Sequence, residues 1–285
     1  MKNKGIEKLG EIIFFLCSLL SIVSIVVICY FIFKNGIPFI MKYGISDFVL
    51  GTKWKPTASP GTFGILPMIL GSIYVTFGSM VIGIPIGIFT AVFMVYYCPR
   101  KLYKFLKPAL NLMAGIPSIV FGFFALMVMV PIVREIWGGT GMNIITGSIL
   151  LGIMVLPTII GLSESSIRSV PKSYYQGSIA LGATHERSIF KVVLPAAKSG
   201  IIASIILAIG RSIGETMAVI LVIGNQARMP HGITRGVRTL TGNIVMEMAY
   251  AANEHREALI ATGVVLFVFI LTINILFNVA KRRMK

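Results

Sequence analysis

The sequence predicts an all-α integral membrane protein with about six transmembrane helices. Of the 285 residues, 56% are hydrophobic and only 13% are charged, about half the charged fraction of an ordinary soluble domain. The mean hydropathy is +0.88. A helix of roughly 20 uncharged apolar residues crosses a bilayer, and several stretches are long enough to do so. The charge-free stretches are residues 12–33, 56–99, 108–133, 136–163 and 258–280.

These stretches give five of the six expected spans once residues 56–68, which contain three prolines and two glycines, are assigned to an ordered loop. The remaining span, residues 199–224, has no charged residues apart from Arg211 and Glu215. Backbone polar groups in lipid must be satisfied within the segment, so each span is expected to be a helix. The continuous apolar runs lack the two-residue alternation of a β-barrel. The expected spans are residues 12–33, 69–96, 108–132, 143–163, 199–224 and 258–280.

The N-terminal apolar run from Ile12 to Phe33 follows Lys2, Lys4 and Lys8, a pattern that also occurs in signal peptides. The run is longer than a signal-peptide core, and no small-residue cleavage site follows it. We therefore expect the first span to be retained in the mature protein.

The distribution of Lys and Arg predicts the orientation, because cytoplasmic loops carry the excess of basic residues. With the N-terminus inside, the inner segments hold 15 basic residues in 57 positions and the outer segments hold 9 in 78. We therefore expect both termini in the cytoplasm. The inner segments are residues 1–11, 98–107, 165–195 and 281–285, and the outer segments are 34–68, 133–142 and 225–257.

Composition also excludes several functions. The net charge of +16 does not indicate a nucleic acid partner, because the basic residues lie at the ends of apolar runs. The three Cys and three His lack metal-ligand spacing, so no metal site and no cofactor are expected. The chain has no G-x-x-x-x-G-K-[ST] segment to bind nucleotide phosphates. We expect no catalytic residues.

The inner loop 165–195 is expected to form two short helices. Ser169 is suited to cap the first, and Gly182 to end it in the left-handed conformation. Thr184 is suited to cap the second, which we expect Pro195 to stop before the next span.

This loop divides into two sets of side chains. One set is apolar and is expected to tie the helices to the membrane spans, whereas the other is free to meet another protein. Alternatively, the loop only connects two spans. The apolar set is Ile179, Leu181, Ile189, Val192 and Val193, and the free set is Ala180, Ala183, His185 and Arg187.

Two charged residues, Arg211 and Glu215, lie in the fifth expected span. Their spacing of four places them on one helix face, where they can pair. Charges within a membrane usually face a bundle interior or a water-filled cavity. The pair is therefore either part of a substrate pathway, with the neighbouring Ser212 and Thr216, or a structural pair that fixes helix packing.

Prolines and glycines recur together within the expected spans. They indicate either ordinary close packing of membrane helices or a pathway with bendable walls. The residues are Pro85, Pro117, Pro131, Pro157, Gly83, Gly87, Gly115 and Gly152.

The 165–195 loop resembles the "EAA" loop of bacterial ABC-importer permeases, whose pattern is E-A-A, three residues, G, nine residues and I-x-L-P. Here the pattern falls on Gln176-Gly177-Ser178, Gly182 and Val192–Pro195, with the spacing kept and the acid replaced. The resemblance implies a coupling helix that docks in a groove of an ATP-binding subunit. The implied coupling residues are Gln176, Gly177, Ser178, Ala180, Gly182, Ala183, Thr184, His185 and Arg187.

The string Arg211–Thr216 resembles the R-x-x-G-E-T segment of phosphate-specific ABC importer permeases, and Met217-Ala218-Val219 resembles their C-type subunit. Gly51–Pro56 and Gly115–Ser118 agree with this resemblance, which extends from about residue 45 to the C-terminus. The implied substrate-pathway residues are Arg211, Ser212, Glu215 and Thr216.

The resemblance implies a type I ABC importer permease fold in a bacterial cell membrane. The implied partners are an ATP-binding cassette ATPase dimer, an A-type permease subunit, an extracytoplasmic phosphate-binding protein, inorganic phosphate and membrane lipid. ATP hydrolysis would then belong to a partner. Residues 1–65 are expected to form an N-terminal transmembrane helix and outer loop, and residues 66–285 the transmembrane domain.

Three other functions stay open. The first is a permease for another oxyanion, such as molybdate, sulfate or phosphonate. The second is a secondary transporter or channel, although no inverted repeats are seen. The third is a membrane-embedded enzyme, although the ten acidic residues are scattered along the chain.

Overall fold

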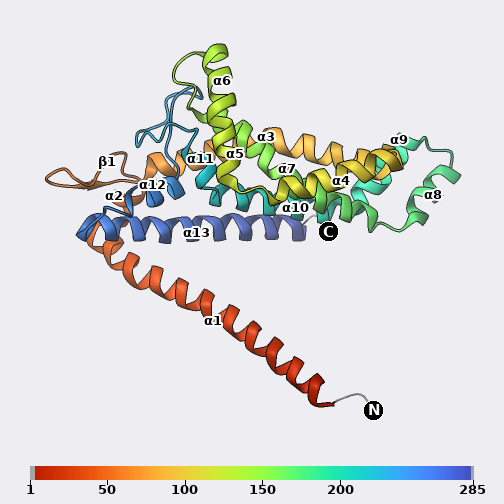
Figure 1. The fold of residues 1–285 in the computed structure, drawn as a ribbon, viewed down its shortest axis with the longest axis horizontal. Coiled ribbons are helices and arrows are strands. Elements are labelled where there is room, and N and C mark those ends of the chain that lie inside the picture. Colours follow the sequence, from red (N-terminus) through yellow and green to blue (C-terminus); the bar gives the residue numbers. More distant parts are fainter. Residues whose placement is uncertain (1–3, 284–285) are drawn as a thin grey trace.

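The computed structural model describes residues 4–283, and six of its helices are long and apolar enough to cross a membrane. The prediction of an all-α membrane protein is therefore confirmed. In Figure 1 most of the long helices run along one direction, with α8 and α9 at one end and β1, α2 and α12 at the other. The six candidate spans are Lys8–Tyr43, Leu66–Tyr97, Ser118–Trp137, Ile144–Arg168, His185–Gly214 and Asn253–Leu276.

The first helix, α1 (Lys4–Tyr43), packs on the last helix, α13 (Asn253–Arg283), through its C-terminal part only. There the rings of Phe33 and Phe267 meet edge to face, 5.6 Å apart. The N-terminal part diverges from α13 (Figure 1), and its large apolar side chains are exposed all around the helix. A helix that is apolar on every side is suited to a lipid environment.

The centre of the bundle is the close approach of α3 (Leu66–Val92) to α7 (Ile144–Arg168). A Cβ atom at Gly83 would lie 2.8 Å from Val155 Cγ2, and one at Gly87 would lie 2.5 Å from Ile159 Cγ2. These two glycines therefore allow α3 and α7 to pack closely, which is the first of the two alternatives predicted for the small residues in the spans.

The third span differs from the expected residues 108–132, because Pro117 separates two helices. Helix α4 (Arg100–Gly115) ends before Ile116, whose backbone is extended, and α5 (Ser118–Phe124) begins after Pro117. A proline lacks a backbone donor and keeps the preceding residue out of the helical region.

The rest of the third span is a π-helical segment, Ala125–Met129, followed by α6 (Val130–Trp137). Helix α4 is a separate amphipathic helix with four basic residues, and it lies beside α7.

The fifth span is one continuous helix that starts earlier and ends earlier than the expected residues 199–224. It consists of α9 (His185–Ser188), a π-helical segment (Ile189–Val193) and α10 (Leu194–Gly214). The prediction that Pro195 stops the preceding helix is wrong. Pro195 lies in the first turn of α10, where a proline is tolerated, and the preceding π-helical segment keeps the helix continuous up to this turn. A short helix, α11 (Met217–Ile220), follows separately.

Short elements cover the two ends of the bundle. The loop before α3 is ordered, as predicted: α2 (Ile45–Val49) leads into a hairpin of β1 (Trp54–Lys55) and β2 (Thr62–Phe63), in which Trp54 pairs with Phe63. Helix α12 (Leu240–Glu247) lies at the same end, and α8 (Lys172–Ala180) at the other (Figure 1).

The contact of α3 with α7 can be tested with two matched glycines. We expect Gly87→Ala to lower the stability by about 1–3 kcal/mol, because the added methyl group overpacks against Ile159. In contrast, Gly161→Ala meets no atom within 4 Å and gains helix propensity. Thermal unfolding in detergent compares the two variants, and a Gly87→Ala protein as stable as Gly161→Ala would contradict the packing role.

Candidate transport and coupling sites

The 165–195 loop forms two short helices, α8 and α9, as the sequence predicts. Gly182 has a φ of 84°, the left-handed conformation expected of it, and the Thr184 hydroxyl accepts a hydrogen bond from Arg187 N at 3.3 Å. The prediction for Ser169 is wrong. Helix α8 begins only at Lys172, and Ser169 instead ends α7, where its hydroxyl donates to Ser166 O at 2.7 Å.

The apolar side chains of this loop divide differently from the expectation. Ile189 and Val193 are fully buried, as predicted, but Ile179 is 39% exposed and Leu181 is 91% exposed. Leu181 lies directly after α8 and before the left-handed Gly182, so the turn carries it outward rather than onto the spans. Its exposure leaves a large apolar side chain at the tip of the loop.

His185 is not a free surface residue, which corrects the prediction. Its Nδ1 atom lies 2.6 Å from the hydroxyl oxygen of Tyr175, and its ring meets those of Tyr96 and Tyr97 at centroid distances of 6.1 and 5.0 Å. Tyr96 and Tyr97 belong to the π-helical segment Phe93–Tyr97 that ends α3. The imidazole therefore joins the loop to the end of α3.

The remaining predicted coupling residues lie on or near the surface. Ser178 is half-buried and accepts a hydrogen bond from the Ser188 hydroxyl at 3.0 Å, which ties α8 to α9. Ala183 is also half-buried. The exposed members of the set are Gln176, Gly177, Ala180, Gly182, Thr184 and Arg187.

A buried carboxylate lies just before the loop, and sequence reasoning missed it. Glu164 of α7 is 2% exposed. Its oxygens accept hydrogen bonds from the Tyr103 hydroxyl at 2.7 Å, Lys107 Nζ at 2.8 Å and Arg168 Nε at 2.9 Å. Because the first two donors belong to α4, the carboxylate fixes α4 to α7.

Arg168 extends this connection to α3. Its guanidinium lies over the ring of Tyr103, 5.1 Å from the centroid, and Nη2 donates to Met94 O at 3.4 Å. The ends of α3, α4 and α7 therefore meet at one cluster, which we call the Glu164 cluster (Tyr103, Lys107, Glu164 and Arg168). The His185 contacts place α8 and α9 against the same end of α3.

The predicted pairing of Arg211 with Glu215 is wrong. Helix α10 ends at Gly214, and Glu215 has an extended backbone with φ −68° and ψ 131°. Its Oε1 atom accepts hydrogen bonds from Thr216 N at 3.2 Å and Ala218 N at 3.3 Å. The carboxylate therefore begins α11 instead of neutralising the arginine.

Arg211 is exposed on the surface of this chain, and its Nη1 donates to Thr158 Oγ1 of α7 at 3.4 Å. Among residues 4–283, no carboxylate lies within ion-pair distance of it. Ser212 is buried and its hydroxyl has no hydrogen-bond partner in the described part of the chain, whereas Thr216 Oγ1 donates to Gly214 O at 3.2 Å. An unpaired guanidinium is suited to bind an oxyanion.

A second buried carboxylate, Glu247 of α12, lies at the opposite end of the bundle. It accepts hydrogen bonds from Trp54 Nε1 at 2.9 Å and from Arg238 Nη1, and it lies 2.8 Å from His255 Nε2. Burial raises the pKa of the Glu247 carboxyl, but its partners Trp54, His255 and Arg238 outweigh burial and hold that pKa below its usual 4.5. No sequence signal reveals this cluster, because Trp54 and Glu247 are 193 residues apart.

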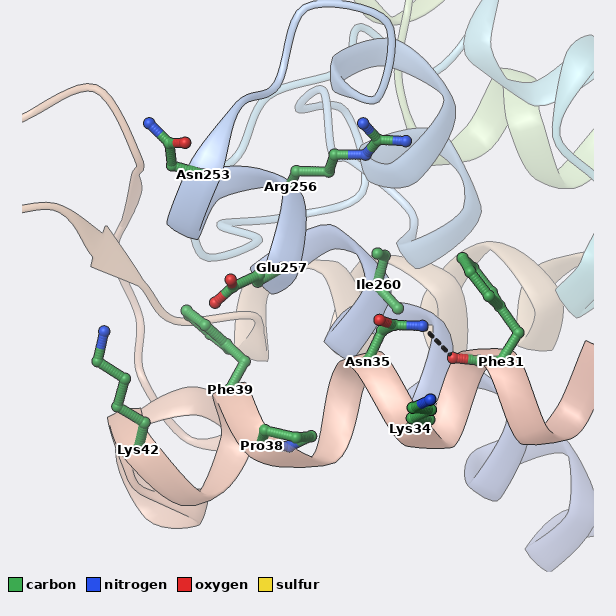
Figure 2. A pocket seen from close by; sticks show the side chains of 10 residues that line it. All are labelled: Phe31, Lys34, Asn35, Pro38, Phe39, Lys42, Asn253, Arg256, Glu257 and Ile260. Atoms are coloured by element: carbon green, nitrogen blue, oxygen red, sulfur yellow. Dashed lines mark hydrogen bonds between the residues drawn. The ribbon is translucent and has the colours of Figure 1, made fainter.

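The same end of the bundle has a cavity of about 520 Å³ between α1 and α13. Figure 2 shows its lining, which includes Lys34 and Lys42 of α1 and Arg256 and Glu257 of α13. Lys42 Nζ lies 2.6 Å from Glu254 Oε1. Basic and acidic side chains are therefore mixed around this cavity. Within residues 4–283, no group of three or more His, Cys, Asp or Glu is placed to hold a metal ion.

Six apolar spans and a helical loop at one end of the bundle define a multi-pass membrane protein. Residues 83–285 match the family described as binding-protein-dependent transport system inner membrane component. The chain therefore belongs to this family and is a permease subunit of an ABC importer.

Individual relatives agree with this assignment. The chain is 36% identical to the "probable ABC transporter permease protein YqgH" of Bacillus subtilis (strain 168), over 96% of this chain and 92% of that protein. It is 31% identical to the phosphate transport system permease protein PstC of Mesorhizobium japonicum, over 79% of this chain and 75% of that protein.

A solved structure shares the fold. A bacterial alginate ABC transporter, in complex with its alginate-pentasaccharide-bound periplasmic protein, aligns with a TM-score of 0.69 over 99% of this chain and 97% of the matched chain. The sequence identity is 15%, so this likeness concerns the fold alone. It confirms the prediction of a type I ABC importer permease fold.

The role of Glu247 predicts a loss of stability on neutralisation. We expect Glu247→Gln to lower the free energy of unfolding by about 3 kcal/mol at about pH 7, because the mostly buried Arg238 loses its charge partner. Since the folded pKa is lowered, the wild type has this stabilisation above pH 4.5 and loses it as the pH falls further. Glu247→Gln should not show this loss of stability at low pH.

Thermal unfolding of both proteins at about pH 7 and about pH 4 measures this difference. Glu257→Gln, which neutralises an exposed carboxylate at the same end of the bundle, is the matched control and should behave as the wild type. Equal unfolding temperatures of all three proteins would contradict the role of Glu247.

Proposed function

We propose that this chain is the C-type permease subunit of an ATP-driven phosphate importer and forms half of its translocation pathway. One observation carries the proposal: the guanidinium of Arg211 is exposed near the end of an apolar helix and has no carboxylate within ion-pair distance in residues 4–283. The likeness to PstC proteins supports phosphate as the substrate.

Arg211 would bind the anion by charge-assisted hydrogen bonds, and the hydroxyls of Ser212 and Thr216 are neighbours able to join it. Glu215 would act differently from a counter-ion. Its carboxylate is occupied by the backbone N–H groups of Thr216 and Ala218, so it would position α11 beside the arginine. Arg211 also lies at the surface of this chain, where a second permease subunit would complete the pathway.

The 165–195 loop would dock on the ATPase dimer, with Leu181 and the exposed side chains of α8 and α9 entering its groove. ATP binding would move this loop, and the contacts of His185 with Tyr96 and Tyr97 would pass the movement to the end of α3. The Glu164 cluster would then carry it to α4.

From α4 the chain leads directly to the pathway. Helix α5 follows the break at Pro117, and its Gly122 lies so close to α11 that a Cβ would be 2.8 Å from Ala218 Cα. Ala218 N in turn binds the Glu215 carboxylate. A shift of α4 and α5 would therefore reach the residues next to Arg211.

The complete transporter would contain two ATPase subunits, an A-type permease and an extracytoplasmic phosphate-binding protein, with ATP hydrolysed by the ATPases. Both termini would lie in the cytoplasm of a bacterium, with residues 1–65 as the N-terminal helix and outer loop and 66–285 as the transmembrane domain. The lipid bilayer would cover the exposed apolar side chains of α1.

Reconstitution of the whole transporter in liposomes tests this function. We expect ATP-dependent uptake of radiolabelled phosphate that excess molybdate, sulfate or phosphonate does not prevent. Because a guanidinium accepts any tetrahedral oxyanion, uptake blocked by one of these competitors would assign the permease to that anion instead. Uptake without ATP would indicate a secondary transporter.

Neutralising Arg211 should abolish most transport without affecting assembly. Loss of a charged hydrogen-bond donor weakens anion binding by about 10- to 100-fold, so we expect Arg211→Gln to reduce phosphate uptake by at least about 10-fold. Arg256→Gln, which neutralises an exposed arginine of α13, is a charge-matched comparison outside the pathway and the docking loop. Normal uptake by Arg211→Gln at normal abundance would remove this residue from the mechanism.

Replacing Leu181 should weaken docking of the ATPase and, as a consequence, transport. An aspartate at this exposed tip would enter an apolar contact as an unpaired charge, so we expect Leu181→Asp to reduce ATPase binding and uptake by about 10-fold or more. Leu181→Met keeps the apolar volume and should keep both activities. Co-purification of the ATPase and uptake assays measure the two effects, and an unchanged Leu181→Asp transporter would reject the docking role.

A further inference from the structure

The segment 225–239, between α11 and α12, has a fixed base. Val237 N donates to Ile223 O at 2.9 Å, and Arg238 Nε donates to Asn225 O at 3.0 Å. These bonds hold both ends of the segment together at the end of α11. The middle of the segment therefore projects from an anchored base, although it has no helix or strand of its own.

Two cavities border the projecting part, and both have Gln226, Arg235 and Gly236 in their lining. One, of about 340 Å³, is lined by Arg228, His231 and Arg235 together with Gln226 and Gly236. The other, of about 330 Å³, lies between Arg235 and the turn at residues 137–140 that follows α6. A water molecule takes about 30 Å³ in the liquid, so each cavity has room for an oxyanion with several waters.

The charge around these two cavities is positive throughout. Arg228, His231 and Arg235 are exposed, and neither cavity has an Asp or Glu in its lining. Over residues 4–283, neither arginine has a carboxylate within ion-pair distance. The cavity of Figure 2 differs, because Glu257 lines it beside the basic residues.

Arg238, at the base of the segment, explains why the other two arginines keep their charge available. Its guanidinium donates hydrogen bonds to Glu247 and, at 2.9 Å, to Asn243 Oδ1. The Glu247 carboxylate already interacts with three side chains, those of Trp54, Arg238 and His255. Glu247 is therefore already paired, and within the described residues 4–283 Arg228 and Arg235 have no carboxylate in ion-pair distance.

We propose that Arg228, His231 and Arg235 form a second oxyanion site, which receives the anion at the end of the bundle opposite α8 and α9. This inference rests on the proposed transport function and adds a step to it. The base of the segment is bonded to Ile223, three residues after α11, and the start of α11 is bonded to the Glu215 carboxylate, four residues after Arg211. The site would keep the released anion near the pathway entrance through charge-assisted hydrogen bonds.

The test compares three forms of the reconstituted transporter in phosphate uptake at increasing concentrations of the loaded binding protein. These are the wild type, the double variant Arg228→Gln/Arg235→Gln and the control Arg256→Gln, which removes an exposed arginine from the cavity of Figure 2. We expect the double variant to lose at least about 10-fold in maximal uptake while the half-saturating concentration of binding protein stays unchanged. The control should match the wild type.

Two results would overturn the proposal. If saturating binding protein restores wild-type uptake, the arginines contact that protein and not the anion. If the double variant transports like the wild type, the cavities have no role in transport. A wild-type transporter that takes up no phosphate would instead refute the proposed function itself, so the two failures are distinguishable.

A direct measurement uses inorganic phosphate alone. The three free cysteines, Cys17, Cys29 and Cys98, are replaced by serine, and an environment-sensitive dye is attached to Ile233→Cys, an exposed position between His231 and Arg235. We expect phosphate to change the fluorescence and chloride at equal ionic strength to leave it unchanged. The same response in the Arg228→Gln/Arg235→Gln background would contradict the site.

Discussion

The buried carboxylate of Glu164 is the interaction on which one end of this bundle depends. A carboxylate that is 2% exposed is stable only if hydrogen bonds and positive charges replace water around it. Tyr103 and Lys107 of α4 and Arg168 of its own helix supply them. Because these donors come from different segments, satisfying one acid brings the ends of α3, α4 and α7 together beside the 165–195 loop.

The opposite end of the bundle has the same design around Glu247, which joins the hairpin, α12, α13 and the 225–239 segment. Between the two clusters, α3 and α7 pack tightly through glycines, whereas the third span is broken at Pro117 and contains a π-helical segment. Interruptions of this kind are common at functional sites. The arrangement favours a rigid α3–α7 pair beside a more adjustable path through α4, α5 and α11.

Composition was sufficient to predict the fold class, because six long apolar stretches have few alternatives to membrane helices. The boundaries were harder. Pro117 lies inside a charge-free stretch, so charge gave no sign that the helix breaks there. The predicted pairing of Arg211 with Glu215 assumed a continuous helix, whereas α10 ends at Gly214, before Glu215.

The candidate sites were only partly visible in the sequence for a related reason. Gly182 and Thr184 have local conformational roles, and their behaviour was predicted correctly. His185 is held by tyrosines of α3, and Glu247 by Trp54, which only the tertiary structure brings near. Burial of Ile179 and Leu181 was expected from their chemistry alone, whereas the turn at Gly182 turns Leu181 outward.

The proposed transport mechanism depends on contact between the α8–α9 region and a nucleotide-hydrolysing subunit, and site-specific crosslinking measures that contact most directly. The variant Leu181→Cys, with Cys17, Cys29 and Cys98 replaced by serine, would be crosslinked in the whole transporter in its native membrane with a short bifunctional reagent, in the presence and absence of ATP. We predict a crosslinked product with the ATPase subunit, and its yield should change with ATP. A product only with the binding protein, or none with any subunit, would contradict it.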